Sequence, residues 1–247
     1  MVRKPKSSGT ETAAPQDPRG KIVEALMALA SERDFDDITI AEIAEKADVS
    51  LADFREGFPS KGAVLAGFAR QVDLAVLRGT AEDMADESAK DRLFDVLMRR
   101  LDAMASHKAA LQNILRWARR DPLAAAALNG VALNSMRFML EAAKLSSEGP
   151  AGALKLQGLV FAWSRVLAVW FKDEDSGLAR TMAALDKELE RGAAMVARAD
   201  DLQRLTAPFR NLCEGLFNAR RGLRDGLRRR ERWGRGEGPG EAEARAS

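Results

Sequence analysis

The sequence of 247 residues contains no tyrosine, a single cysteine, Cys213, and a single histidine, His107. One cysteine excludes a disulfide within the chain, and this pair of residues excludes a cluster of Cys and His metal ligands. The sequence also lacks a glycine-rich phosphate loop and any pattern of a nucleophile beside a base. We therefore predict no metal, no cofactor and no enzymatic activity, and we expect His107 to have a capping or surface role.

Long apolar runs are also missing. No stretch approaches the roughly 18 consecutive apolar residues that a membrane-spanning helix needs. The polar start MVRKPKSSGTETAAPQDPRG lacks the apolar core of a signal peptide, so we expect a cytoplasmic protein. Residues that are branched at Cβ are sparse, whereas Ala, Leu, Arg and Glu dominate, and this composition favours helices almost everywhere. The predicted fold class is all-α.

The net charge of +2 hides an uneven distribution along the chain. Residues 1–21 carry five basic and two acidic side chains in a segment rich in Ser, Thr, Pro and Gly, which is typical of a flexible arm. Residues 22–62 hold four basic and ten acidic groups, and residues 202–235 hold ten arginines against three acidic groups. The arm and the carboxyl end are therefore basic, and the segment that follows the arm is acidic.

Two helices are predicted directly after the arm. Asp17 followed by Pro18 is a good helix start, and apolar residues then repeat with helical spacing up to Arg33. Thr39 and Glu42 form a capping-box pattern, in which each side chain satisfies a free amide of the other residue. This second helix runs to about residue 47.

A short break at residues 48–50 separates the second helix from a third. Ser50, with Asp53 three residues later, is able to cap a helix from Leu51 to Phe58. Pro59 ends that helix, and Ser60 caps a longer one that runs from residue 61 towards 77. A break this short between two helices predicts a helix-turn-helix.

The segment ITIAEIAEKADVSLADFREGFPSKGAVLAGFA resembles the DNA-binding domain of the TetR family of one-component repressors, over about residues 20–70. The resemblance rests on Thr39, Ile43, Ala44, Ala47, Val49, Ser50, Phe58, Ser60 and Lys61. It implies that the helix at 51–57 enters the major groove, that Lys61 touches backbone phosphate, and that the amino end of the first helix donates to phosphate. The DNA-contacting residues that follow are Thr39, Ser50, Leu51, Ala52, Arg55 and Lys61.

The sequence departs from the family at the expected contact surface, where the usual Tyr and His positions hold Arg55 and Gly57. Arg55 is able to pair with guanine, whereas Asp53 and Glu56 are expected to oppose docking into a phosphate-lined groove. Attraction must then come from basic side chains around the arm, namely Arg3, Lys4, Lys6, Arg19 and Lys21. The alternative is a three-helix scaffold that no longer touches DNA.

Five further helices are expected in a larger body, at about 91–105, 107–118, 123–143, 151–172 and 177–197, the last one capped by Ser176. In the first of them, Arg99 and Arg100 are placed on a face other than the apolar stripe. The resemblance implies an apolar ligand pocket between the middle helices and a homodimer through the last two. Large apolar residues that either line such a pocket or form simple core are Met136, Phe138, Met139, Phe161, Trp163, Leu167 and Trp170.

Residues 92–190 are also similar, in helix order and spacing, to the lipid-binding accessory proteins of ubiquinone biosynthesis. This second resemblance rests on helix lengths and on scattered residues such as Trp170, Asp173, Thr181 and Leu185. It implies an isoprenoid-like lipid as ligand, a role in bringing a quinone precursor to a hydroxylase, and a terminal amphipathic helix.

The carboxyl end has an apolar residue at every third or fourth position, with arginines between them. A helix of this kind suits the headgroup region of an anionic membrane, and a solvated tail or nonspecific attraction to nucleic acid are the alternatives. The stripe and its arginines comprise Leu205, Phe209, Leu212, Leu216, Arg220, Arg221, Leu223, Arg224 and Leu227.

We therefore expect a flexible arm at 1–19, a helix-turn-helix domain at 20–65, a ligand-binding and dimerisation body at 66–200, a basic amphipathic helix at 201–233 and a disordered tail at 234–247. The predicted function is a TetR-type transcriptional regulator, specifically a repressor that senses a hydrophobic small molecule and binds operator DNA. The alternative is a TetR-fold lipid-binding accessory protein of ubiquinone biosynthesis that associates with the inner membrane face and does not bind DNA.

Overall fold

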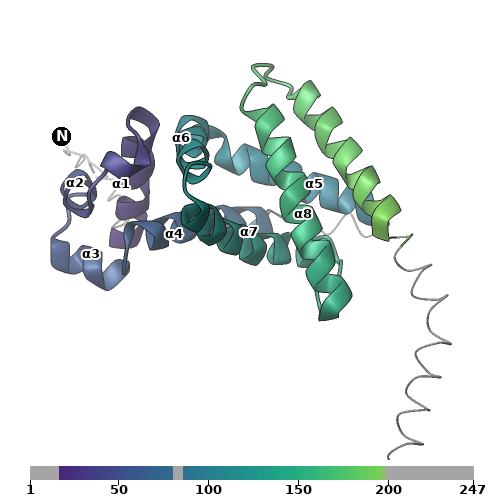
Figure 1. Cartoon of the computed structure of the whole chain (residues 1–247), viewed down its shortest axis with the longest axis horizontal. Coiled ribbons are helices and arrows are strands. Elements are labelled where there is room, and N and C mark those ends of the chain that lie inside the picture. Colours follow the sequence, from purple (N-terminus) through teal and green to yellow (C-terminus); the bar gives the residue numbers. More distant parts are fainter. Residues whose placement is uncertain (1–16, 80–85, 197, 199–247) are drawn as a thin grey trace, which may run out of the picture. The chain divides into compact units, whose positions relative to one another are not determined.

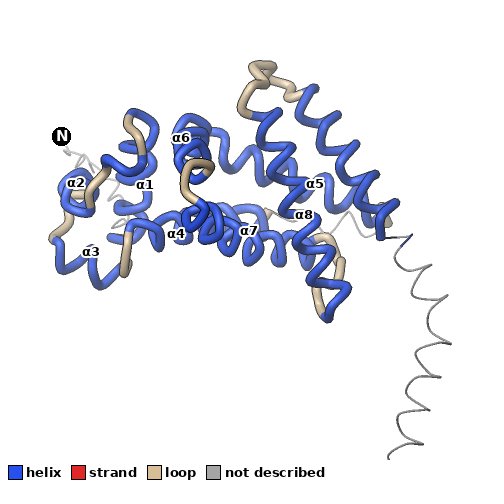
Figure 2. Tube along the Cα trace, in the orientation of Figure 1, coloured by secondary structure: helices blue, strands red, loops and turns tan. Residues whose placement is uncertain are grey.

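The computed structural model describes residues 17–79, 86–196 and 198, and every regular element in those ranges is a helix, as Figure 2 shows. No strand occurs in the described part of the chain. This confirms the predicted all-α class. Contacts group the chain into one compact unit up to Ala193 and a second one from Ala194 onwards. All the packing considered below lies within the first unit.

Four helices form the amino-terminal region: α1 (Pro18–Glu32), α2 (Ile40–Lys46), α3 (Leu51–Gly57) and α4 (Lys61–Arg78). A short 3-10 turn, Phe35–Asp37, lies between α1 and α2. Each helix begins at the predicted cap, where a side-chain oxygen of Asp17, Thr39, Ser50 or Ser60 accepts a hydrogen bond from a main-chain amide of the first turn. The helix-turn-helix pattern is therefore confirmed as a local structure.

The remaining labelled helices are α5 (Ala89–Met104), α6 (Lys108–Ala118), α7 (Pro122–Ala142) and α8 (Gly149–Trp170), shown in Figure 1. A further helix follows over residues 179–196. The helix starts were predicted to within two residues. One of them, α8, begins at Gly149, where a chain break was expected.

The amino-terminal helices pack on the body through α1. This helix contacts α2, α3 and α4, and it also lies along α6. The Asn113 side-chain amide donates to the Ala30 carbonyl at 3.0 Å, and the rings of Phe35 and Trp117 have centroids 4.4 Å apart. A residue of α6 therefore satisfies a carbonyl near the end of α1, so the packing of these two helices is fixed by a hydrogen bond as well as by apolar contact.

The helix α4 connects the two regions without interruption. It starts beside α3 and reaches α5 and α7, so the domain boundary predicted between residues 65 and 66 falls inside it. His107 lies at the same junction, with its ring edge-on to Phe68 at 5.1 Å and its Nε2 atom 3.7 Å from a Glu24 carboxylate oxygen. Of the two roles expected for His107, capping is wrong, because its side chain makes no cap hydrogen bond at α6, and the residue lies partly exposed.

The turn between α8 and the helix at 179–196 is fixed by aspartates. Asp173 Oδ2 accepts from the Thr181 amide at 2.8 Å and from the Thr181 hydroxyl at 2.7 Å, and Asp175 accepts from the Ala179 amide. Asp173 and Thr181 are buried, and the hydrogen bond from the Thr181 hydroxyl is the main cause that lowers the pKa of Asp173. The prediction that Ser176 caps this helix is wrong.

Residues 199–247 lie outside the described residues. The predicted amphipathic helix, including its stripe from Leu205 to Leu227 and its arginines Arg220, Arg221 and Arg224, falls there together with Cys213. Within the described ranges, Pro122–Ala142 and Gly152–Trp170 are long and apolar enough to cross a membrane by length and composition alone. Core helices of soluble proteins pass the same test, and both helices bury one face in the body.

Candidate nucleic-acid interface

The helix α3 is held in place by phenylalanines on its inner side. Phe54 and Phe58 are buried, with ring centroids 6.5 Å apart, and the Arg19 guanidinium lies over the Phe58 ring at 4.7 Å. A Cβ atom at Gly67 would come within 2.7 Å of that ring, so only glycine allows α4 to pass so close. This aromatic packing buries the inner side of α3, and the opposite side of the helix faces outward.

The outward side of α3 carries all three of the predicted DNA-contacting residues of this helix. Leu51 is 58% exposed, and Ala52, Arg55 and Glu56 are exposed as well. Within the described ranges, the side chains of Arg55 and Glu56 make no hydrogen bond or ion pair. These two charged groups are therefore available to a partner.

Asp53 uses its carboxylate inside its own helix. Its Oδ2 atom accepts from the Ser50 hydroxyl at 2.6 Å and from the Ser50 amide at 3.1 Å, while the Asp53 amide donates to the Ser50 hydroxyl oxygen. The hydrogen bonds from Ser50 lower the pKa of Asp53. The carboxylate expected to repel DNA keeps its charge, but it is turned towards the positive end of α3.

A second capping box at the start of α2 includes an ion pair. Glu42 accepts from the Thr39 amide and hydroxyl at 2.8 Å, and Arg33 donates to Glu42 at 2.6 Å. The Arg33 hydrogen bond, followed by those from Thr39, lowers the pKa of Glu42 to about 2. The Thr39 and Ser50 hydroxyl hydrogens, both predicted to face DNA, are thus already donated within the protein.

Lys61 stands at the beginning of α4 and points inward. Its Nζ donates to the Phe35 carbonyl and, at 2.7 Å, to the Ile38 carbonyl, and it lies 4.4 Å from the centre of the Phe35 ring. Partial burial lowers the pKa of Lys61. Because an ammonium has three donors, at most one N–H remains for the phosphate contact that the resemblance implied.

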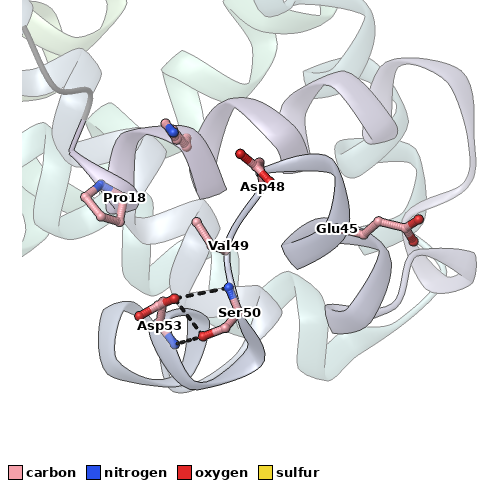
Figure 3. Close-up of a pocket in the computed structure, with 7 residues that line it drawn as sticks. Pro18, Glu45, Asp48, Val49, Ser50 and Asp53 are labelled. Carbon is pink, nitrogen blue, oxygen red and sulfur yellow. Dashed lines mark hydrogen bonds between the residues drawn. The ribbon is translucent and has the colours of Figure 1, made fainter.

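An open pocket of about 540 Å³ lies between the start of α1 and the turn of the helix-turn-helix (Figure 3). It is lined by Pro18, Lys21, Glu45, Asp48, Val49, Ser50 and Asp53. At its edge, the first turn of α1 is capped by Asp17, whose Oδ1 atom accepts from the Arg19 amide at 3.2 Å. The amino end of α1, expected to donate to phosphate, therefore already has a carboxylate beside it.

A buried ion pair in the body joins three helices. Arg100 of α5 donates through Nη1 to Asp73 Oδ1 of α4, and the Ser135 hydroxyl of α7 donates to the same oxygen. All three residues are buried, with Arg100 only 5% exposed, and burial lowers the pKa of Arg100 although Asp73 raises it. The prediction that Arg100 lies away from the apolar stripe is wrong, because Asp73 compensates its charge inside the core.

The predicted pocket residues divide into two groups. Met136, Met139, Trp163 and Trp170 are buried in one hydrophobic core, and Leu167 packs against it. Phe161 is 63% exposed and Phe138 is exposed as well, so neither lies in that core. Whether a ligand binds among the buried residues stays a prediction.

The sequence-based reasoning missed Asp73 and Ser135. A usable signal for Asp73 existed, because it sits between Val72 and Val76 on the apolar stripe of α4, where a lone carboxylate needs a buried partner. The sequence does not indicate that Arg100 is the partner of Asp73, because the two residues are 27 positions apart along the chain.

Comparison with protein-family models gave no match, and comparison with curated proteins gave none. Among solved structures, the chain is similar to a TetR transcriptional regulator from Nitrosomonas europaea, with 20% identity, a TM-score of 0.58, and coverage of 72% of this chain and 98% of that one. It is also similar to a TetR transcriptional regulator from Rhodococcus, with 21% identity, a TM-score of 0.53, and coverage of 73% and 97%.

Neither neighbour is an accessory protein of ubiquinone biosynthesis. The residues that suggested that resemblance, Trp170, Asp173, Thr181 and Leu185, are buried together around the turn after α8, so a structural role accounts for them. The similarity to the two regulators spans both the helix-turn-helix and the body. The chain has the fold of the TetR transcriptional regulators.

Proposed function

We propose that the protein is a DNA-binding transcriptional regulator that reads DNA through α3 and responds to a hydrophobic small molecule in its helical body. The observation that carries the proposal is the outward side of α3. It presents Leu51, Ala52 and Arg55 while Phe54 and Phe58 hold the helix from behind. A short helix supported in this way is the element that helix-turn-helix proteins place in the major groove.

The charge of the interface sets its dependence on salt. The acidic segment 22–62 disfavours nonspecific attraction to DNA, so basic side chains of the arm and of α1 have to supply it. Asp53 opposes docking less than its charge suggests, because its carboxylate is directed at the amide of Ser50. Specific binding is therefore expected to rest on Arg55 more than on general attraction.

Selection from a random DNA library, at low and at physiological salt, tests this function. Wild type should enrich one sequence, and Arg55→Ala should lose about 1 to 3 kcal/mol of binding to it, the energy of a bidentate pair with guanine. Arg137→Ala removes an exposed arginine of α7 as a matched control and should change little. Failure to enrich any sequence at low salt, or equal behaviour of the two variants, would overturn the proposal.

The exposed apolar side of α8 supports a homodimer. Leu154 is 70% exposed, Phe161 is similarly exposed, and Gly158 between them has open space in front of it. Apolar side chains at this spacing form a continuous stripe on one side of a helix, which a second copy of the chain is expected to cover.

Sedimentation of the full chain tests the dimer. Wild type is expected to sediment as a dimer, and Phe161→Glu is expected to give monomers, because it places a charge in the stripe. Glu174→Gln, a change at an exposed residue outside α8, is the control for sample quality. A dimer that survives Phe161→Glu would place the interface elsewhere.

A further inference from the structure

Among the described residues, the guanidinium of Arg100 has one edge without a protein partner. In that part of the chain, Asp73 and Arg100 meet through Nη1 alone, and Nε is buried with no hydrogen-bond partner. Within the described residues, Nη2 makes no hydrogen bond or ion pair either. A guanidinium usually binds a carboxylate through two parallel N–H groups, so the Nε and Nη2 edge retains the geometry for a second anion.

The Trp163 ring lies over the guanidinium of Arg100, and two methionines of α7 lie within one turn of Ser135, whose hydroxyl shares the Asp73 oxygen with Arg100. The Trp163 ring of α8 lies 5.9 Å from the guanidinium carbon, and Met136 and Met139 of α7 are fully buried in the same core. Methionine side chains are unbranched and repack with little cost, so the core is able to admit an apolar group beside them. A free ion such as chloride would leave this apolar surface unused.

We infer that Arg100 is the recognition group for a carboxylate-bearing amphipathic ligand, whose carboxylate binds the Nε and Nη2 edge and whose apolar part packs among Trp163, Met136 and Met139. This inference rests on the proposed function only in treating the body as the sensing region. It adds the chemical class of the ligand. An alcohol or a hydrocarbon of the same shape leaves the edge unsatisfied and binds more weakly.

The position of Asp73 connects this site to α3. Asp73 is on α4, which runs without a break to Lys61 beside the helix-turn-helix. A ligand carboxylate on Arg100 lies close to the Asp73 carboxylate, and the two like charges repel across the shared cation. Ligand binding therefore weakens the Arg100–Asp73 ion pair that joins α5 to α4.

Calorimetry on the full chain without DNA tests the inference, with decanoate and decanol as probes of equal chain length. Wild type should bind decanoate at least about tenfold more tightly than decanol, the factor expected for a charge-assisted hydrogen-bond pair. Arg100→Lys keeps the charge but removes the planar edge, and it should cost decanoate about tenfold while sparing decanol. Arg92→Lys, on the same helix, is the matched control and should change neither.

Asp73→Asn supplies an independent measurement. Asparagine still accepts from Arg100 and Ser135, and it removes the repulsion, so decanoate affinity should rise several-fold. If Arg100→Lys fails to fold, this variant decides alone. Wild type that does not prefer decanoate, or an Asp73→Asn variant with unchanged decanoate affinity, overturns the inference and leaves a buried water on that edge as the explanation. The calorimetry uses no DNA. Failure of the DNA-selection experiment would therefore contradict the proposed regulator function without affecting this test of ligand binding.

Discussion

The helix-turn-helix and the body use aspartates in opposite ways. Asp53 is exposed and bonds to Ser50, three residues away, whereas Asp73 is buried and bonds to residues 27 and 62 positions away. The first carboxylate fixes where one helix begins, and the second fixes how three helices pack. The Asp53 carboxylate therefore determines local structure, and the Asp73 carboxylate determines tertiary structure.

The largest expected effect concerns the body. Arg100→Leu leaves Asp73 buried without its partner, and we expect it to lower the free energy of unfolding by about 3 to 5 kcal/mol. Asp73→Leu combined with Arg100→Leu removes both charges and should recover most of that loss. Urea unfolding of the two variants measures the difference. A loss below about 1 kcal/mol in Arg100→Leu would mean that water already reaches the pair, which would remove the contrast between the two regions.

Lys61 is the exception in the amino-terminal region, because it makes long-range contacts. Lys61→Met removes a charged donor from the carbonyls of Phe35 and Ile38, and it should cost about 1 to 3 kcal/mol of unfolding free energy. The dependence of DNA binding on salt should stay unchanged. A decrease of about one in the salt slope would instead show that Lys61 contacts phosphate, as the family resemblance implied.

Lys61, Asp53 and Asp73 show which parts of the structure the sequence predicts and which it does not. Capping boxes at Thr39 and Ser50 were predictable, because their partners lie three residues on and the pattern repeats in any context. The inward direction of Lys61 was not, since its acceptors are main-chain carbonyls without a residue signature. The resemblance correctly identified the fold. Its assignment of Lys61, Thr39, Ser50 and the amino end of α1 to DNA contact stays a prediction, and each of these groups already has a hydrogen-bond partner within the chain.

The body was predictable as a set of helices and much less so as a packed core. Apolar spacing found the ends of α5 to α8 to within a few residues. It placed Arg100 outside the apolar stripe, because a single helix pattern does not reveal a buried counter-charge on another helix. It also grouped Phe161 with the buried Trp163, although residues two positions apart in a helix point to nearly opposite sides.

A smaller effect is expected at Asp48, in the turn between α2 and α3. Its backbone has a φ of 53°, the left-handed region that glycine adopts without strain. Asp48→Gly should raise the free energy of unfolding by about 0.5 to 1 kcal/mol, whereas Asp48→Asn should leave it nearly unchanged. Thermal unfolding measures both.

The same pair of variants separates strain from charge. Both remove one negative charge from the acidic segment, so both should raise DNA affinity equally, by an amount that falls with added salt. If asparagine stabilises the fold as much as glycine does, repulsion among the acidic groups rather than backbone strain is the cost at this position.

The smallest effect should come from Glu42, whose partners are exposed. Its pKa is about 2 in the folded chain and 4.5 ordinarily, chiefly because Arg33 and Thr39 donate hydrogen bonds to it. A lowered folded pKa adds stability above the ordinary value, and this contribution is lost as the pH falls towards 2. Glu42→Gln should therefore be less stable than wild type at neutral pH, with the gap closing between pH 4.5 and 2. In an Arg33→Met background the difference in stability that Glu42→Gln makes should be smaller, because the main cause of the lowered pKa of Glu42 is gone. A difference that does not depend on pH would show that Glu42 acts by packing. Even this local cap would then depend on tertiary contacts.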